Sequence, residues 1–381
     1  MNFKKSLSLG ALVIIALLTS GCMNKLETVK TDTKQTKITN LDKWLKNLNK
    51  DEKFSGSVLL AKRGEIIFQK QYGFEDIKDT ISLTENSSFN IASLSKPFTA
   101  MAIMILQQEQ KLQFSDDITK YIPEWDYLSG ITIRHLLQHT SGLVDYMYLA
   151  DKYWDDNKIF TTSDMIRLFQ NQKPKLKFTP GNKYEYSNTG YVILSEIVTR
   201  VSGKKYADFM AENIFIPLKM KDSAIFNKLS DEKVLKHRVY GFSSQGILSS
   251  KKVLNDLNYL DGVAGDGGVY TTALDLFKWS QAIKNGTIVS KENYTKAFEL
   301  TTLNNEKKSD YGFGWQINSD GSYEHSGSWA GFSSYLHSNP KEETLLIILD
   351  NSDNMYRIIP DYGLSKNDSI TLNLFDFMKK Y

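Results

Sequence analysis

The chain has 381 residues, of which 41% are hydrophobic and 24% are charged. This composition excludes an intrinsically disordered chain and supplies the core of one large domain or two closely joined ones. The formal net charge of +3 falls by two, to +1, without the first 21 residues, which contain two lysines and no acid. A balance so near neutrality argues against a nucleic-acid partner.

The N-terminal residues are typical of an export signal. Lys4 and Lys5 precede an apolar run over 7–18 that is too short to span a bilayer comfortably. The run ends in Leu-Thr-Ser-Gly-Cys at Cys22, which resembles the lipobox of bacterial lipoproteins, with the leucine four residues before the cysteine instead of three. Cys22 is the only cysteine, so no internal disulfide can form. We predict a signal peptide over 1–21 and lipidation of Cys22, with a plain signal peptide as the alternative.

A protein processed in this way is secreted and anchored to the extracytoplasmic side of a membrane by its lipid. The polar residues over 22–38 have no apolar period and are predicted to form a flexible tether. Asn40 is then a candidate N-cap for a helix whose apolar residues share one face, namely Leu41, Trp44, Leu45 and Leu48. The folded domain is therefore expected to begin near residue 39.

Beyond this helix the pattern is β-rich, then helical, then β-rich again. Two strands over 56–61 and 65–70 are joined by a turn with Gly64 where positive φ is needed. Apolar residues at three- and four-residue spacing predict helices over 89–106, 131–138, 163–170 and 191–201. Short β-rich runs and a last helix follow, over 312–318, 331–338, 344–349 and 370–378.

These elements predict an α/β fold of the α+β type. One antiparallel sheet would be built from both chain ends and flanked by helices, with a mainly helical second lobe beside it. In this interpretation the domain covers 39–381. Its sheet lobe comprises about 39–90 and 300–381, and its helical lobe about 91–299.

The helix over 89–106 carries a serine and a lysine three residues apart, Ser93 and Lys96. Residues at this spacing lie on one helical face, so the amine can reach the hydroxyl. A buried amine loses part of its proton affinity and can act as a base toward serine. The pattern alone is weak, because the chain holds five Ser-x-x-Lys matches, which begin at Ser93, Ser202, Ser230, Ser249 and Ser338.

Two further polar motifs follow in the chain. Tyr186 and Asn188 form the only Tyr-x-Asn, where a phenol near a lysine can pass protons and an amide can hold a substrate. Later, His325 precedes Ser326 and Gly327 in a predicted strand. A glycine on an edge strand lets a substrate backbone approach closely and leaves an amide free for a cleft.

Ser-x-x-Lys, Tyr-x-Asn and a basic residue followed by Ser and Gly, in this order, resemble the penicillin-recognising serine hydrolases. The resemblance covers about 56–351 and is strongest to the branch of class C β-lactamases, D-Ala-D-Ala carboxypeptidases and related esterases. It includes three further stretches, over 136–143, 217–223 and 265–272. No single motif is specific, but their combined order is.

The resemblance implies a role for each matched residue. Ser93 would be the nucleophile, Lys96 its base and Tyr186 the proton carrier to the leaving group. The residues Asn188, His325, Ser326 and Gly327 would bind substrate. The oxyanion hole would comprise the backbone amides of Ser93 and Ser328. No cofactor or metal is implied, and the substrate would be a small molecule or a peptide, including peptidoglycan.

The third motif departs from the lysine that many β-lactamases and peptidases carry, since it begins with His325. Histidine has an unperturbed pKa near 6.5, so it would attract a substrate carboxylate poorly above neutrality. We therefore expect neutral acyl substrates to be handled better than carboxylate-bearing ones.

Three alternatives compete with this interpretation. His135 and His139 have the spacing of a zinc site, but the glutamate of His-Glu-x-x-His is missing and no third ligand is apparent. An α/β-hydrolase is disfavoured because no Gly-x-Ser-x-Gly occurs. A penicillin-binding or cell-wall-binding surface module that is acylated without turnover stays open, because acylation and deacylation use overlapping groups.

Overall fold

The structure, a computed structural model, describes residues 33–76, 78–244, 252–358 and 369–381. The predicted signal peptide, Cys22 and the first part of the predicted tether lie outside these ranges. No helix within them is long and apolar enough to cross a membrane.

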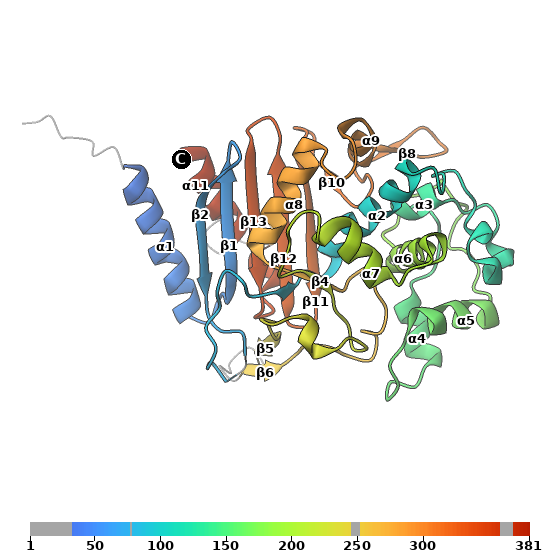
Figure 1. Cartoon of the computed structure of the whole chain (residues 1–381), viewed down its shortest axis with the longest axis horizontal. Helices are drawn as coiled ribbons and strands as arrows, with labels where there is room; N and C mark the ends of the chain where they lie inside the picture. The colour runs from blue at the N-terminus through green and yellow to red at the C-terminus, as the bar shows by residue number, and fades with distance from the viewer. Residues whose placement is uncertain (1–32, 77, 245–251, 359–368) are drawn as a thin grey trace, which may run out of the picture.

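The secondary structure alternates as the sequence predicts, with strands near both ends and helices between them (Figure 1). The helices are α1 (Lys34–Lys50), α2 (Lys96–Gln108), α3 (Ile133–Leu137), α4 (Tyr146–Tyr153), α5 (Thr162–Gln172), α6 (Asn188–Ser202), α7 (Tyr206–Met210), α8 (Ala273–Asn285), α9 (Lys291–Thr295), α10 (Met355–Ile358) and α11 (Ile370–Lys380). The longer strands are β1 (Gly56–Lys62), β2 (Glu65–Tyr72), β11 (Tyr323–Trp329), β12 (Phe332–Asn339) and β13 (Thr344–Asp350). The short strands are β3 (Phe89–Asn90), β4 (Ala224–Ile225), β5 (Phe242–Ser244), β6 (Lys252–Leu254), β7 (Val269–Thr271), β8 (Thr301–Thr302), β9 (Lys308–Ser309) and β10 (Gln316–Ile317).

The main sheet has six antiparallel strands in the order β10-β11-β12-β13-β1-β2. The two chain ends meet where β1 pairs with β13, in a register from Gly56 opposite Asp350 to Lys62 opposite Thr344. This confirms the predicted antiparallel sheet assembled from both ends of the chain. β10 pairs only with Tyr323 and Glu324, so the rest of β11 borders the sheet on that side.

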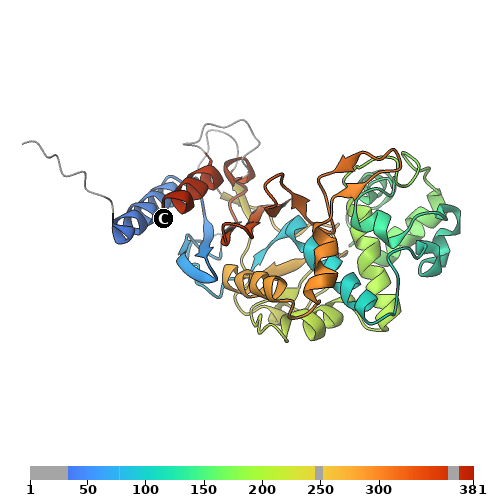
Figure 2. The same ribbon diagram turned by 90° about the horizontal axis from the view of Figure 1, so that it is seen from above.

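Helices cover both faces of this sheet. Figure 2 shows α1 and α11 side by side on one face and α8 on the other. Alternate side chains of β1 lie on opposite faces of the sheet. Val58 and Leu60 pack with α1 and α11, whereas Leu59 and Ala61 belong to the large core that includes α8. Because both faces are buried, the central strands are continuously apolar.

The helical lobe lies beside β11, on the right of Figure 1. Its helix α6 packs against α2 and α3, and the three-stranded sheet β3-β7-β4 lies where this lobe meets the main sheet. The helices predicted for the middle of the chain correspond to α3, α5 and α6. Helix α8, which the sequence analysis assigned to the helical lobe, packs on β1 and β13 of the main sheet.

The structure corrects three predicted boundaries. The helix predicted over 89–106 begins only at Lys96, because residues 89–90 pair as β3 and Ala92, with φ of +48°, starts a 3₁₀ turn. Helix α1 begins at Lys34 instead of after Asn40, because the Thr33 side chain accepts from the Thr36 amide and Ile38 extends the apolar face. Residues 34–38 of the predicted tether are therefore helical. The strand predicted over 312–318 is reduced to β10, because the chain before it turns closely against other segments. A Cβ on Gly314, which has φ of +79°, would lie 2.7 Å from the Pro97 Cα.

Candidate active site

Ser93 lies on a short 3₁₀ turn, Ala92–Ser95, that leads directly into α2. In such a turn residues i and i+3 eclipse one another, which brings Lys96 beneath Ser93. Ala92 has φ of +48°, a left-handed conformation that is unfavourable for any residue with a Cβ. Its amide donates to Asn90 Oδ1 at 2.8 Å. The nucleophile is thus presented by a strained turn, a feature that is typical of functional sites.

Lys96 is fully buried under this turn. Its Nζ donates to Ser93 Oγ at 3.1 Å, to Asn188 Oδ1 at 2.9 Å and to the Asp266 carbonyl oxygen at 2.8 Å. Burial lowers the pKa of Lys96 to about 8, although the carboxylates of Asp266 and Asp145 act in the opposite direction. A lysine with this pKa is partly neutral at mildly alkaline pH and can then accept a proton from serine.

Tyr186 lies just before α6 and places its ring 4.8 Å from Lys96 Nζ. The residue as a whole is 40% exposed, but burial around its hydroxyl raises the pKa of the phenol above the ordinary value, and the hydroxyl of Ser93 acts against that rise. Tyr186 is therefore protonated at neutral pH and lies next to both members of the Ser-x-x-Lys pair. A tyrosine that passes a proton between Lys96 and a leaving group would have to lie in this position.

Asn188 joins the lysine to a residue that the sequence analysis missed. Its Oδ1 accepts from Lys96, while its Nδ2 donates to Asp145 Oδ2 at 3.1 Å. Asp145 is the N-cap of α4, and its Oδ1 accepts from the amide of Met147. Asn188 therefore orients Lys96 as well as facing the cleft. Sequence reasoning could have recognised Asp145 only as a helix cap, because its link to Asn188 spans 43 residues.

Asp266 was also missed, although the glycine-rich stretch around it was predicted to shape a cleft wall. Its carboxyl group is buried and accepts from the Tyr146 hydroxyl at 3.2 Å. Burial raises the pKa of Asp266, with Lys96 acting in the opposite direction. Its neighbours Gly267 and Gly268 line the same cleft.

The predicted third motif lies on β11, where His325 is held by two hydrogen bonds. A carbonyl oxygen can only accept, so Nδ1 must donate to the Ser326 carbonyl oxygen at 2.6 Å. In a neutral ring, Nε2 then accepts from the Tyr311 hydroxyl at 2.9 Å. Burial first, and the charge of Lys96 second, lower the pKa of His325 to about 3. His325 is thus neutral from pH 5.5 to 8.5, and the expectation that it loses charge near neutrality is corrected.

Gly327 brings β11 against the nucleophile turn. A Cβ at this position would lie 2.2 Å from the Ile91 carbonyl oxygen and 2.9 Å from the Ser93 amide nitrogen. Any larger residue would therefore push the strand away from Ser93. The sequence analysis assigned this glycine to contact with a substrate backbone, whereas the tightest packing is with the protein's own turn. Ser328, the predicted second oxyanion donor, follows on the exposed part of β11.

The cleft above Ser93 has two halves. One has a volume of about 290 Å³ and includes Asn188, Asp266 and Trp329; the other, of about 310 Å³, runs along β11 past Ser326. Ser93, Tyr186 and Ser328 line both halves. A substrate bound across them would have its reacting atom beside Ser93, with its acyl and leaving groups on opposite sides.

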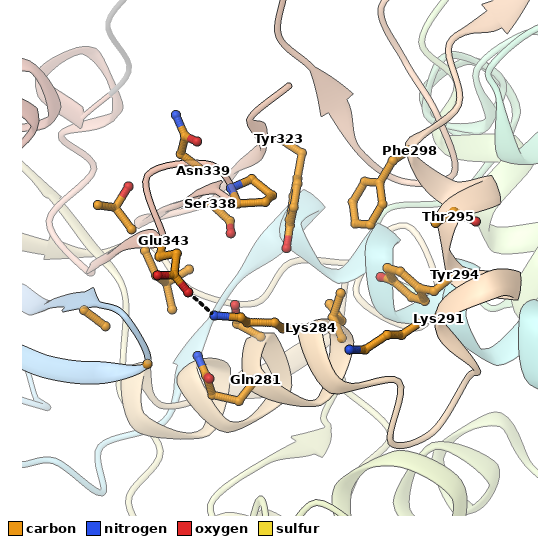
Figure 3. A pocket seen from close by; sticks show the side chains of 17 residues that line it. Gln281, Lys284, Lys291, Tyr294, Thr295, Phe298, Tyr323, Ser338, Asn339 and Glu343 are labelled. Carbon is orange, nitrogen blue, oxygen red and sulfur yellow. Dashed lines mark hydrogen bonds and ion pairs between the residues drawn. The ribbon is translucent and has the colours of Figure 1, made fainter. Parts of the chain in front are cut away.

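A further hollow of about 270 Å³, here called the remote pocket, lies between α8, α9 and the ends of the sheet strands (Figure 3). Its walls include Tyr294, Phe298 and Tyr323, and Lys284 pairs with Glu343 at 2.8 Å across its rim. None of the predicted site residues lines this pocket. Its chemistry is that of an apolar hollow with a surface ion pair.

The two histidines of the zinc alternative have other partners. His135 Nδ1 accepts from the Thr132 amide in the capping box of α3, and His139 Nδ1 accepts from the Ser187 amide. Within the described residues no three His, Cys, Asp or Glu side chains form a group that could hold a metal ion.

Comparison with known proteins agrees with this geometry. Residues 41–361 match the model of the family described as "Beta-lactamase". The chain belongs to the beta-lactamase family of serine hydrolases. It is 36% identical over 330 residues to penicillin-binding protein 4* of Bacillus subtilis, covering 84% of this chain and 73% of that protein.

Two solved structures have a similar fold. The octameric penicillin-binding protein homologue from Pyrococcus abyssi aligns with a TM-score of 0.70 and 26% identity, over 84% of this chain and 76% of that one. The D-amino acid amidase from Ochrobactrum anthropi SV3 aligns with a TM-score of 0.68 and 22% identity, over 90% and 98%. At 22% identity, the similarity to the amidase is evidence for the fold alone.

Proposed function

We propose that this chain is an extracytoplasmic serine hydrolase that forms an acyl-enzyme at Ser93 and cleaves amide or ester bonds, with a preference for leaving groups that carry no carboxylate. The observation that carries the proposal is the fully buried amine of Lys96, 3.1 Å from Ser93 Oγ and with its pKa lowered to about 8. In the proposed sequence, neutral Lys96 accepts the Ser93 proton as Oγ attacks the carbonyl carbon.

The remaining steps use the neighbours of this pair. Tyr186 donates its proton to the departing alcohol or amine and takes up in its place the proton that Lys96 accepted from Ser93. Water then attacks the acyl ester, one of its protons returns to Ser93 Oγ, and the acid product leaves. The amides of Ser93 and Ser328 are the proposed oxyanion donors, and each such donor contributes about 3 kcal/mol to transition-state stabilisation in sites of this kind. Asn188 holds Lys96 in place, and Ser326 and Gly327 border the leaving-group half along β11.

The charge of the cleft supports the restriction on the leaving group. No residue that lines either half of the cleft in the described structure is a lysine or arginine. The half along β11 is lined by Glu324 and by the neutral ring of His325. The other half is lined by Asp261 and Asp266. The amine of Lys96 lies buried beneath Ser93, so a leaving-group carboxylate in the half along β11 would find no cation among the residues that line that half and would face Glu324. Neutral leaving groups are therefore favoured.

The substrate class that follows is an acyl ester or an amide inside a longer or amidated peptide, such as a peptidoglycan peptide. The relative in Bacillus subtilis is named a penicillin-binding protein, which supports labelled penicillin as a probe of Ser93. Membrane attachment through a lipid on Cys22 remains part of the proposal.

The test compares a peptide that ends in D-Ala-D-Ala with the same peptide carrying a C-terminal amide. We expect kcat/KM to favour the amide by roughly tenfold, which corresponds to about 1.4 kcal/mol of repulsion. Any change in this ratio between pH 5.5 and 8.5 should follow Lys96, whose pKa is about 8, and not His325, whose pKa is about 3. The variant His325→Lys should narrow the gap, since lysine supplies a cation.

Two results would contradict the proposal. One is a parent enzyme that cleaves the free acid as fast as the amide. The other is stoichiometric acylation of Ser93 by labelled penicillin and by an ester, with no steady-state turnover of any substrate. The second result would instead identify a penicillin-binding surface module.

A further inference from the structure

His139, at the C-terminal end of α3, is bonded to the chain on both sides of Tyr186. Its backbone oxygen accepts from the Glu185 amide at 2.9 Å, and its ring Nδ1 accepts from the Ser187 amide at 3.0 Å. The Ser187 side chain is in turn the N-cap of α6, the helix that begins at Asn188. One residue therefore holds the segment that carries both members of the Tyr-x-Asn motif.

The ring of His139 also packs against the ring of Tyr186. The two ring centroids are 4.3 Å apart, and the rings of Tyr311 and Tyr191 lie 4.6 Å and 5.1 Å from the histidine. His139 itself has φ of +56°, and a strained backbone of this kind persists only where the surroundings determine it. Each of these features restricts where Tyr186 can lie.

The hydrogen bonds of His139 show that it does not itself move a proton. Because Nδ1 accepts from an amide, the proton of the neutral ring is on Nε2, which is buried and has no hydrogen-bond partner in the described structure. Burial, followed by the charge of Lys96 and by His325, lowers the pKa of His139 well below its ordinary value. Its contribution must therefore be made through its neighbours.

We propose that His139 is a positioning residue that fixes Tyr186 above Ser93 and Lys96. The inference rests on the proposed role of Tyr186 as proton carrier to the leaving group. A displacement of about 1 Å at a reacting centre can lower a rate by roughly 10²-fold. Loss of the Ser187 hydrogen bond therefore slows those reactions in which Tyr186 must deliver a proton.

Two substitutions separate the contacts of His139. His139→Asn retains an acceptor near the Nδ1 position and tolerates positive φ, but it removes the ring. His139→Phe retains a ring and removes the acceptor. His135→Asn is the matched control, because His135 Nδ1 also accepts from a backbone amide, but that amide belongs to Thr132, the N-cap of α3, and not to the segment that carries Tyr186.

The measurement uses a p-nitrophenyl ester and a p-nitroanilide of the same D-alanyl group. A nitrophenolate leaves without a proton, whereas an anilide needs one, so only the anilide depends strongly on Tyr186. We expect His139→Phe to lower kcat for the anilide by roughly 10²-fold and for the ester by less than fivefold. Tyr186→Phe should give the same asymmetry, and the double variant should lose little more.

His139→Asn should recover most of the anilide activity, and His135→Asn should match the parent for both substrates. Equal losses on ester and anilide in His139→Phe, or no loss on either, would overturn the inference. A parent that hydrolyses neither substrate would refute the proposed function instead. In that case crystal structures of the variants decide the inference, because Tyr186 should be displaced in His139→Phe and retained in His139→Asn.

Discussion

Two hollows of nearly equal volume, the cleft half beside Asn188 and the remote pocket, differ in where their charges lie. Beneath the cleft, Lys96 is fully buried and donates a hydrogen bond to Ser93, and its pKa is lowered to about 8. At the remote pocket, the side chains of Lys284 and Glu343 are 52% and 44% exposed and pair with each other. A buried charge needs specific partners, and those partners create reactivity. Volume alone would not distinguish the two hollows, but burial of charge does.

The strongest test of this comparison is removal of the nucleophile. Ser93→Ala should abolish covalent labelling by a fluorophosphonate or a labelled penicillin and lower turnover by at least about 10⁴-fold, because it removes the hydroxyl that accepts from the Lys96 amine. Intact mass should show one adduct in the parent and none in the variant. Ser202→Ala, which alters another Ser-x-x-Lys match, is the control and should label like the parent. Labelling of Ser93→Ala would assign the nucleophile elsewhere.

The next largest effect concerns the proton-handling pair. With an amide substrate, Lys96→Ala and Tyr186→Phe should each lower kcat by roughly 10²-fold or more, because Lys96 Nζ lies 4.8 Å from the centre of the Tyr186 ring and the two groups act together beside Ser93. The double variant should lose much less than the product of the single losses. Circular dichroism should show that each variant is folded. Full turnover in either folded variant would remove that residue from the mechanism.

The buried amine also predicts a pH dependence. Lys96 accepts a proton only when neutral, and burial lowers its pKa to about 8, so kcat/KM for a neutral ester should rise with pH up to about 8 and then level off. The Asp145 carboxylate acts to raise this pKa. Asp145→Asn should therefore move the rising limb to lower pH while its side-chain oxygen still caps α4. A flat profile, or a shift to higher pH, would show that Lys96 is not the base.

The smallest effect is expected at the remote pocket. Lys284→Ala should change the free energy of unfolding by no more than about 1 kcal/mol, because an exposed ion pair contributes little. Urea unfolding measures the change in the free energy of unfolding. The value of kcat/KM for this variant should stay within twofold of that of the parent. A tenfold loss of activity in this variant would show that the remote pocket is coupled to the cleft.

The pairing of Ser93 with Lys96 can be predicted from local spacing, whereas the hydrogen bonds and the pKa of Lys96 depend on tertiary structure. Spacing alone was enough to place Ser93 beside Lys96, because three residues of a helical turn bring the two side chains together. The hydrogen bonds that Lys96 donates to Asn188 and Asp266 join segments 92 and 170 residues apart, and no local pattern reveals them. The pKa of Lys96 depends on exactly those distant neighbours and on burial, so it could not be predicted.

His325 shows the same limit most clearly. The sequence places a titratable ring in a strand near the site, which led to the expectation of a charge change near neutrality. The fold instead buries that ring, bonds both of its nitrogens and sets Lys96 nearby, which moves its titration to about pH 3. Asp145 is a comparable case, because its sequence signal is that of a helix cap and its link to Asn188 is purely tertiary.

The sequence by itself determined the antiparallel sheet built from both chain ends, the helical middle of the chain and the family, because apolar periodicity and motif order are local or linear properties. Only the tertiary structure decided which carboxyl groups surround Lys96, why Gly327 must be a glycine, and that His139 is bonded to both sides of Tyr186. These features depend on distances between segments that are far apart in the chain, and on the burial that their packing creates.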